Sequence, residues 1–406
     1  MIKFPNGFFW GAATSAHQVE GNNVYSDWWE WERKAGLKEV SGEACRQYDL
    51  FCQDFDLARQ LNHNAHRLSI EWSRIEPAAG NFSDKEISHY LDVILALKER
   101  HLEPIVTLHH FTNPQWFFNL GGWKQRHAPA YFLRYVERIV GALSSHVRYW
   151  VTINEPLVYA SHAFLFGVWP PQEKSLLKTK IVADNLAVAH IKAYRLIHRL
   201  YEKNNLPPPS VSIAQNMQAF LPCSLSLRNK IAVSIREHFI NFNFIDTLVR
   251  HKSLDFIGLN YYARSLVETE GWLPRNLAFD VCRKNHHPLK KNYMGWDIYP
   301  QGIYKIASQL HRYGLPIFIL ENGICTQNDS QRWEYISAHL RHLHRAISEG
   351  VKCLGYIYWS LLDNYEWDKG FGPRFGLIEV DYANFRRTVR ESARQFAMIC
   401  KNNGMD

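Results

Sequence analysis

Eight short apolar runs alternate with amphipathic stretches along this chain, and this alternation limits the folds that the sequence can adopt. The runs are rich in β-branched and aromatic residues, which is typical of buried strands, while the stretches between them have the 3.6-residue spacing of helices. Alternating strands and helices favour a parallel sheet, and eight such units predict a closed (β/α)₈ barrel. The predicted strands are residues 8–16, 65–71, 104–109, 149–153, 211–215, 256–260, 316–321 and 351–360.

The predicted helices include residues 83–101, with Ser83 as the N-cap, and residues 129–144, 181–201, 332–348 and 385–400. A chain of 406 residues would suggest two or three domains at about 150 residues each, but α/β barrels often exceed that length as one unit. The sequence contains no Gly/Ser-rich or Pro-rich linker. We therefore expect residues 1–406 to form a single catalytic domain with a (β/α)₈ fold.

Barrel enzymes carry their active sites on the loops that follow the carboxyl ends of the strands. Polar side chains gather at these predicted ends, namely Gln18, Arg67, Glu71, His110, Glu155, Tyr262, Glu321, Glu366 and Trp367. Glu155 and Glu321 each follow a buried run and precede a residue that stops a strand. Two glutamates at one barrel mouth are the minimal apparatus for cutting a glycosidic bond. From the residues alone, the two could also be unrelated, one in a salt bridge and one in a helix cap or turn.

Six stretches in a fixed order narrow this choice. They read Phe-Pro-Asn-Gly-Phe-Phe-Trp-Gly-Ala-Ala-Thr-Ser-Ala-His-Gln-Val-Glu-Gly at 4–21, His-Arg-Leu-Ser-Ile-Glu-Trp-Ser-Arg-Ile at 66–75, Thr-Ile-Asn-Glu-Pro at 152–156, Gly-Leu-Asn-Tyr-Tyr at 258–262, Leu-Glu-Asn-Gly at 320–323 and Tyr-Trp-Ser-Leu-Leu-Asp-Asn-Tyr-Glu-Trp at 358–367. Through them the chain resembles glycoside hydrolase family 1, the β-glucosidase family, from residue 4 to about residue 398.

This resemblance implies a retaining β-glycosidase that hydrolyses terminal β-D-glycosyl residues, gluco or else galacto or fuco, without a cofactor. Glu155 matches the general acid/base and Glu321 the nucleophile, whose carboxyl groups lie about 5–5.5 Å apart in retaining enzymes. Burial and the charge of Glu321 should raise the pKa of Glu155, and Arg67 should keep Glu321 ionised.

The resemblance also implies a sugar-binding set beside the two glutamates. Its members are Gln18, His110, Asn154, Tyr262, Trp359, Glu366 and Trp367, with Arg67 and Asn260 as supporting residues. Glu366 matches members that act on non-phosphorylated sugars, because a carboxylate would repel a 6-phosphate. His109, Phe111 and Leu320 depart from the family pattern, and Phe111 should weaken stacking on the sugar.

The loop after the first strand is shorter than in the family, which predicts an open aglycone side that accepts small or varied leaving groups. Trp169 and Trp296 either line this side or are buried beneath loops. Three alternatives stay open at this point: a transglycosylase, a 6-phospho-β-glycosidase, and a barrel that binds carbohydrate without catalysis.

The rest of the composition predicts few other partners. The net charge of +8 is spread over scattered basic residues, as in the groups Arg341, His342, His344, Arg345 and Arg386, Arg387, Arg390, so solvated helix faces are favoured over a nucleic-acid groove. His339, His342 and His344 lack a carboxylate motif and are predicted to be exposed rather than to bind a metal, and His286 and His287 fall in a predicted loop.

Location is predicted from what the sequence lacks. Seven cysteines without a CxxC pair argue against a disulfide framework. No signal peptide or apolar span is evident, so we expect a soluble, cytoplasmic protein with small-molecule glycosides as partners and no membrane association; the oligomeric state is not predicted.

Overall fold

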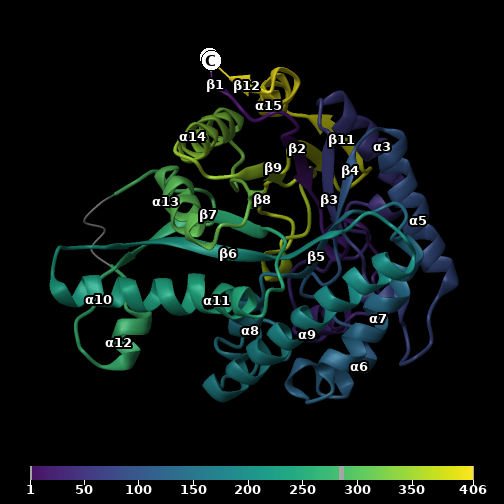
Figure 1. Cartoon of the computed structure of the whole chain (residues 1–406), viewed down its shortest axis with the longest axis horizontal. Coiled ribbons are helices and arrows are strands. Elements are labelled where there is room, and N and C mark those ends of the chain that lie inside the picture. Colours follow the sequence, from purple (N-terminus) through teal and green to yellow (C-terminus); the bar gives the residue numbers. More distant parts are fainter. Residues whose placement is uncertain (1, 283–287, 406) are drawn as a thin grey trace.

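The computed structural model, which describes residues 2–282 and 288–405, contains a closed barrel of eight parallel strands in the order β2 to β9. The barrel closes where β2 pairs with β9, with Gly11 opposite Ile357. Its strands are β2 (Phe9–Ala13), β3 (Ala65–Ser69), β4 (Glu103–Thr107), β5 (Tyr149–Asn154), β6 (Ser210–Pro222), β7 (Ile257–Val267), β8 (Ile317–Asn322) and β9 (Cys353–Trp359). Each of the eight predicted runs contains one of these strands in whole or in part, and the predicted (β/α)₈ fold is confirmed (Figure 1).

Helices surround the barrel and pack their apolar faces on its outer surface (Figure 1). Those that follow successive strands are α3 (Gln47–Gln60), α5 (Asp84–Glu99), α7 (Ala128–Leu143), α9 (Leu176–Lys203), α11 (Asn243–Arg250), α13 (Gln301–Leu310), α14 (Asp329–Ser348) and α15 (Glu391–Asn402). The predicted cap of α5 is confirmed, because the Ser83 side chain accepts a hydrogen bond from the Glu86 amide. A second, smaller core fills the barrel interior, where the Phe9 and Phe318 rings stack with centroids 5.7 Å apart.

The helix predicted over residues 385–400 begins too early. Residues Arg386–Val389 form strand β11, which pairs antiparallel with β10 (Ile378–Asp381), and α15 begins only at Glu391. The basic residues of this segment are therefore not a solvated helix face. The buried Arg387 forms an ion pair with Asp54, and Arg390 forms one with Asp363. Pairing with β10 overrides the helical spacing that the sequence displays.

His339 also differs from its prediction. It is fully buried on α14, and its ring stacks on Tyr335 with centroids 3.7 Å apart. It lies on the side of α14 that packs on the barrel, because its spacing from Ile336 and Leu343 places all three on one face. His286 and His287 lie outside the described residues. Within residues 2–282 and 288–405, no helix is long and apolar enough to cross a membrane.

Strands β6 and β7 are much longer than the runs that predicted them. Their pairing continues to Pro222 opposite Val267, so the two strands form a ribbon that projects beyond the barrel (Figure 1). Near its end, Cys223 and Cys282 form a disulfide, although the cysteine pattern of the sequence predicts no disulfide framework. The two cysteines are far apart in sequence, and only the extended ribbon brings them together. The Glu268 carboxylate lies within 4.8 Å of both sulfur atoms, but sulfurs joined to each other are not thiolate ligands for a metal.

Candidate active site

Glu155 stands at the turn between strand β5 and helix α8 (Pro156–Phe164). Its backbone has φ 43°, a left-handed conformation that is rare for glutamate and is further disfavoured by the following proline. Strained backbone of this kind persists only where the surrounding structure enforces it, and it is concentrated at functional sites. The turn directs a buried carboxyl group, with the residue only 7% exposed, into the mouth of the barrel.

Glu321 lies near the carboxyl end of β8, and both of its oxygens are bound. Arg67 Nη1 on β3 donates to Oε1 at 2.6 Å, and the Tyr262 hydroxyl on β7 donates to Oε2 at 2.5 Å. The glycine of the Glu-Asn-Gly motif is required by packing, because a Cβ atom on Gly323 would lie 1.9 Å from the Trp359 carbonyl oxygen. The hydrogen bonds from Arg67 and Tyr262 are short and involve a charged carboxylate, and they fix the orientation of Glu321.

A network of amides connects the two glutamates. Arg67 Nη2 donates to Asn154 Oδ1 at 2.7 Å, and Asn260 Nδ2 donates to Glu155 Oε1 at 2.7 Å and to Asn154 Oδ1 at 3.2 Å. Asn216 Nδ2 on β6 also donates to Glu155 Oε1, at 3.0 Å. Side chains from strands β3, β5, β6, β7 and β8 thus hold both carboxyl groups against one cavity of about 550 Å³.

Burial, together with the smaller effect of the nearby charge of Glu321, raises the pKa of Glu155 to about 8. The amide bonds from Asn260 and Asn216 and the charge of Arg67 act against this shift but are weaker. At neutral pH, Glu155 therefore carries a proton. Glu321 lies against the Arg67 guanidinium and accepts two hydrogen bonds, so the environments of the two carboxyl groups differ as an acid and a nucleophile require.

The remaining cavity wall combines polar groups with aromatic faces. The Gln18 amide donates to Glu366 Oε2 at 3.3 Å, and the His110 ring stacks on Trp359 and Trp367 with centroids 5.9 and 6.2 Å apart. Burial and the charge of Glu321 raise the pKa of Glu366 to about 8, whereas burial and Arg67 lower the pKa of His110 well below its usual value. A neutral imidazole and a protonated carboxyl both offer hydrogen bonds to hydroxyl groups, and indoles pack against C–H faces.

The structure brings together nearly all of the residues predicted for the site. Those that line the cavity are Gln18, His110, Asn154, Glu155, Trp169, Tyr262, Trp296, Glu321, Trp359, Glu366 and Trp367. Arg67 and Asn260 lie behind this wall and reach it through their hydrogen bonds. Glu71 does not line the cavity; it is bound to Ser73 and Thr112 at the start of a short helix.

Asn216 is the main residue that sequence reasoning missed. It follows the fifth predicted run, at residues 211–215, whose carboxyl end carries none of the predicted site residues. The rule that located Glu155 and Glu321 at strand ends applies equally to Asn216. The observed strand β6 ends at Pro222, seven residues beyond the end of the predicted run at residue 215. Asn216 therefore lies within the strand.

Trp169 and Trp296, the two tryptophans predicted for the aglycone side, differ in exposure, and Phe111 lies beside Trp169. Trp169 is 6% exposed and donates its indole N–H to Asp368 at 2.9 Å, while Trp296 is 37% exposed. Phe111, in a left-handed conformation with φ 72°, packs against Trp169 and Trp367 with centroids 5.0 and 5.2 Å apart. Phe111 therefore lines the cavity and also supports the tryptophans beside it.

Comparison with known proteins adds a family match over nearly the whole chain. The model of Glycosyl hydrolase family 1 matches residues 1–252 and 248–405. Beta-glucosidase A of Thermotoga maritima is 30% identical over 451 residues, covering 100% of this chain and 99% of the relative. Beta-galactosidase of Sulfolobus acidocaldarius is 30% identical over 481 residues, covering 100% of this chain and 96% of the relative.

Solved structures agree with these matches. A beta-glycosidase from Pyrococcus horikoshii superposes with a TM-score of 0.92 at 38% identity, covering 100% of this chain and 96% of the other. The beta-glucosidase from Thermotoga maritima in complex with glucoimidazole gives a TM-score of 0.92 at 30% identity, covering 99% of this chain and 100% of the other. The match therefore extends over the barrel and over the loops that build the cavity.

Proposed function

The chain belongs to glycosyl hydrolase family 1, and we propose that it is a retaining β-glycosidase that removes terminal, non-reducing β-D-glycosyl residues by double displacement. The observation that carries this proposal is the environment of the two carboxyl groups on one cavity. Glu155 is buried with a pKa raised to about 8, while Glu321 is bound by Arg67 and Tyr262. No cofactor takes part in the proposed chemistry.

In the first step, Glu321 attacks the anomeric carbon as the bond to the leaving group breaks. Glu155 transfers its proton to the departing glycosidic oxygen, and a covalent bond forms between the sugar and a Glu321 oxygen. The Tyr262 and Arg67 hydrogen bonds direct the Glu321 oxygens toward the cavity before attack. We assign Asn154 to the sugar 2-hydroxyl, where a contact of this kind strengthens in the transition state.

In the second step, the ionised Glu155 removes a proton from water, and the water oxygen attacks the anomeric carbon from the face that the leaving group vacated. The bond to Glu321 breaks, and the sugar leaves with its original β configuration. Asn260 and Asn216, which both donate to Glu155 Oε1, stabilise the ionised form that this step needs.

We propose neutral hexosides as the substrate class, with gluco and galacto sugars as first candidates because relatives are named beta-glucosidase and beta-galactosidase. Lys369, which lines the catalytic cavity, is paired with Asp368 at 2.5 Å, and a 6-phosphate would have to compete with this carboxylate for it. Glu366 at pKa about 8 offers a hydrogen bond to a sugar hydroxyl rather than a full charge at neutral pH. This arrangement favours unmodified sugars over phosphorylated ones.

A panel of nitrophenyl β-glycosides, each with and without a 6-phosphate, tests this proposal. We expect turnover of the unphosphorylated gluco or galacto substrates, with a first-formed product in the β configuration by proton NMR. A panel dominated by phosphorylated substrates would contradict the assignment of Glu366 and Lys369, and a first-formed α product would contradict the retaining mechanism.

We expect kcat/KM for an aryl β-glucoside to fall as the pH rises through about 8. Only protonated Glu155 can act as the general acid, and because the pKa of Glu155 is raised to about 8, its protonated fraction declines by about tenfold per pH unit above that value. A pH profile of kcat/KM measures this decline. The Glu366→Gln variant should show the same decline at a lower overall activity. A wild-type profile that stays flat to about pH 10 would contradict the assignment of Glu155 as the general acid.

A further inference from the structure

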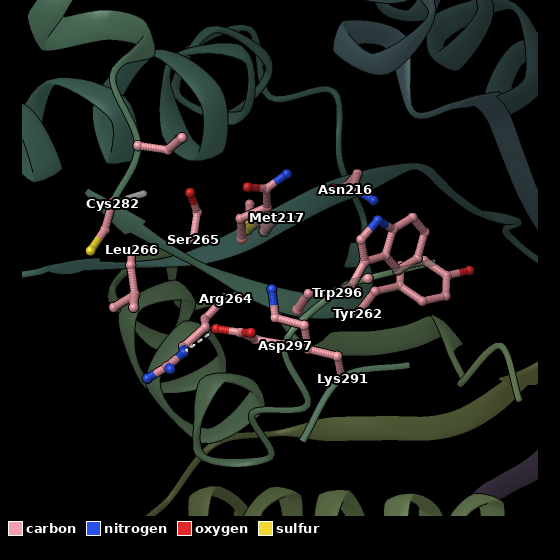
Figure 2. Close-up of a pocket in the computed structure, with 14 residues that line it drawn as sticks. Asn216, Met217, Tyr262, Arg264, Ser265, Leu266, Cys282, Lys291, Trp296 and Asp297 are labelled. Carbon is pink, nitrogen blue, oxygen red and sulfur yellow. Dashed lines mark hydrogen bonds and ion pairs between the residues drawn. The ribbon is translucent and has the colours of Figure 1, made fainter. Parts of the chain in front are cut away.

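A second cavity, of about 370 Å³, continues from the catalytic cavity along the β6–β7 ribbon. The two cavities share Asn216, Gln218, Tyr262 and Trp296 as lining residues. Asn216 donates to Glu155, the residue that protonates the departing oxygen in the proposed mechanism. The second cavity therefore begins beside the position of the leaving group. We call it the ribbon groove, and Figure 2 shows its walls.

One wall of the ribbon groove is the projecting part of β7, and the facing wall is the segment 291–297 (Figure 2). Asp297 holds the two walls together. It forms an isolated antiparallel bridge with Arg264 of β7, whose Nε donates to the Asp297 carboxylate at 2.9 Å, and a second bridge joins it to Lys291 within its own segment. The Arg264 and Asp297 side chains are only 6% and 12% exposed, so this ion pair is largely removed from solvent. The two walls are therefore joined at Asp297.

The charges of the ribbon groove differ from those of the catalytic cavity. Asp297 is the only acidic residue among the described residues that line it, and its charge is matched by Arg264. Lys291 is exposed, and its amine forms no ion pair with any residue in 2–282 or 288–405. In Figure 2 its side chain extends into the groove between Trp296 and the Arg264–Asp297 pair. The catalytic cavity, in contrast, is lined by four carboxyl groups, those of Glu155, Glu321, Glu366 and Asp368, and its Lys369 is paired with Asp368.

We propose that the ribbon groove selects glycosides whose leaving group carries an acidic function, and that Lys291 is the residue that recognises it. This inference rests on the proposed function and adds a substrate class to it. With the sugar against Glu321, the leaving group passes Asn216 and packs on the exposed face of Trp296. An anionic end of the leaving group then meets the Lys291 ammonium, whereas in the catalytic cavity it would meet carboxyl groups.

Matched pairs of aryl β-glucosides test the proposal. In each pair, one member carries a carboxylate and the other the corresponding carboxamide, at the end of an alkyl chain attached to the aryl ring. The chain is lengthened stepwise so that one member reaches Lys291. The measured quantity is the ratio of kcat/KM for carboxylate over carboxamide, compared between wild type and Lys291→Met. This comparison cancels the intrinsic difference in leaving-group reactivity within each pair.

Lys290→Met is the matched control, because Lys290 is adjacent and equally charged but is paired with Glu334 on α14 at 3.1 Å. We expect Lys291→Met to lower the ratio by about three- to fivefold for at least one chain length, as for an exposed ion pair, and Lys290→Met to leave it unchanged. Added salt should lower the wild-type ratio but not that of Lys291→Met.

Equal ratios in wild type and Lys291→Met at every chain length would overturn the proposal. An equal decrease in both lysine variants would also overturn it, because it would reflect the net charge of the surface and not a site. Failure to hydrolyse any neutral glucoside would instead refute the proposed function itself, so the two failures are distinguishable in the same assay.

Discussion

Replacing Glu321 with alanine is expected to lower kcat by at least about 10⁴-fold, because Glu321 forms the covalent bond to the sugar in the proposed mechanism. Losses of this size accompany removal of a nucleophile in other covalent enzymes. The measurement is steady-state turnover of a nitrophenyl β-glucoside, with azide added to the Glu321→Ala variant. Azide is small enough to occupy the vacated space, and a single displacement by azide should yield the α-glycosyl azide.

The control for this experiment addresses folding. Glu321→Ala leaves the buried Arg67 without its carboxylate partner, although Arg67 still binds Asn154, Thr107 and the Leu320 carbonyl. Glu321→Gln keeps an oxygen that accepts from Arg67 and should therefore fold with nearly the wild-type melting temperature. Near-normal turnover in either variant would remove Glu321 from the mechanism, and an azide product in the β configuration would do the same.

Replacing Glu155 with glutamine is expected to have the second largest effect, and its size should depend on the leaving group. For a glycoside with a poorly acidic leaving group, the first step needs proton transfer, and kcat/KM should fall by about 10²–10⁴-fold. For a dinitrophenyl glucoside the leaving group departs without a proton, so kcat/KM for that substrate should fall far less. The measurement is the ratio of these two losses.

The same variant should lose the decline in kcat/KM above pH of about 8, because glutamine does not titrate. Azide should then intercept the covalent intermediate and give the β-glycosyl azide, opposite in configuration to the product of Glu321→Ala. Equal losses for both leaving groups, together with an unchanged pH profile, would show that Glu155 is not the acid. Asn260 and Asn216 can still donate to the glutamine oxygen, so the local structure should be preserved.

The sequence predicted the barrel and the position of both glutamates because these follow from local patterns. A buried parallel strand is a short apolar run, and the residue after it faces the site in any barrel of this kind. Glu155 and Glu321 are therefore predictable one strand at a time. The chain of hydrogen bonds that connects them through Arg67, Asn154 and Asn260 joins separate strand ends, and only the closed barrel brings these ends together.

Features that depend on distant pairing were mispredicted or missed. Arg387 has helical spacing from its basic neighbours, but its strand pairs with β10 and its side chain is buried against Asp54. Cys223 and Cys282 meet only because the β6–β7 ribbon extends past the barrel. The left-handed backbone of Glu155 has no local signature either, because glutamate rarely adopts it and the surrounding structure must impose it.

The most direct test of the double displacement is the mass of the peptide that contains Glu321 after the protein has reacted with an activated 2-deoxy-2-fluoro β-glucoside. The fluorine slows both steps, and the activated leaving group restores the first, so the covalent intermediate should accumulate. We predict one fluoroglucosyl unit attached to Glu321, and none on the Glu321→Ala variant. A label on another residue, or turnover without any label and with inversion of the product, would contradict this mechanism.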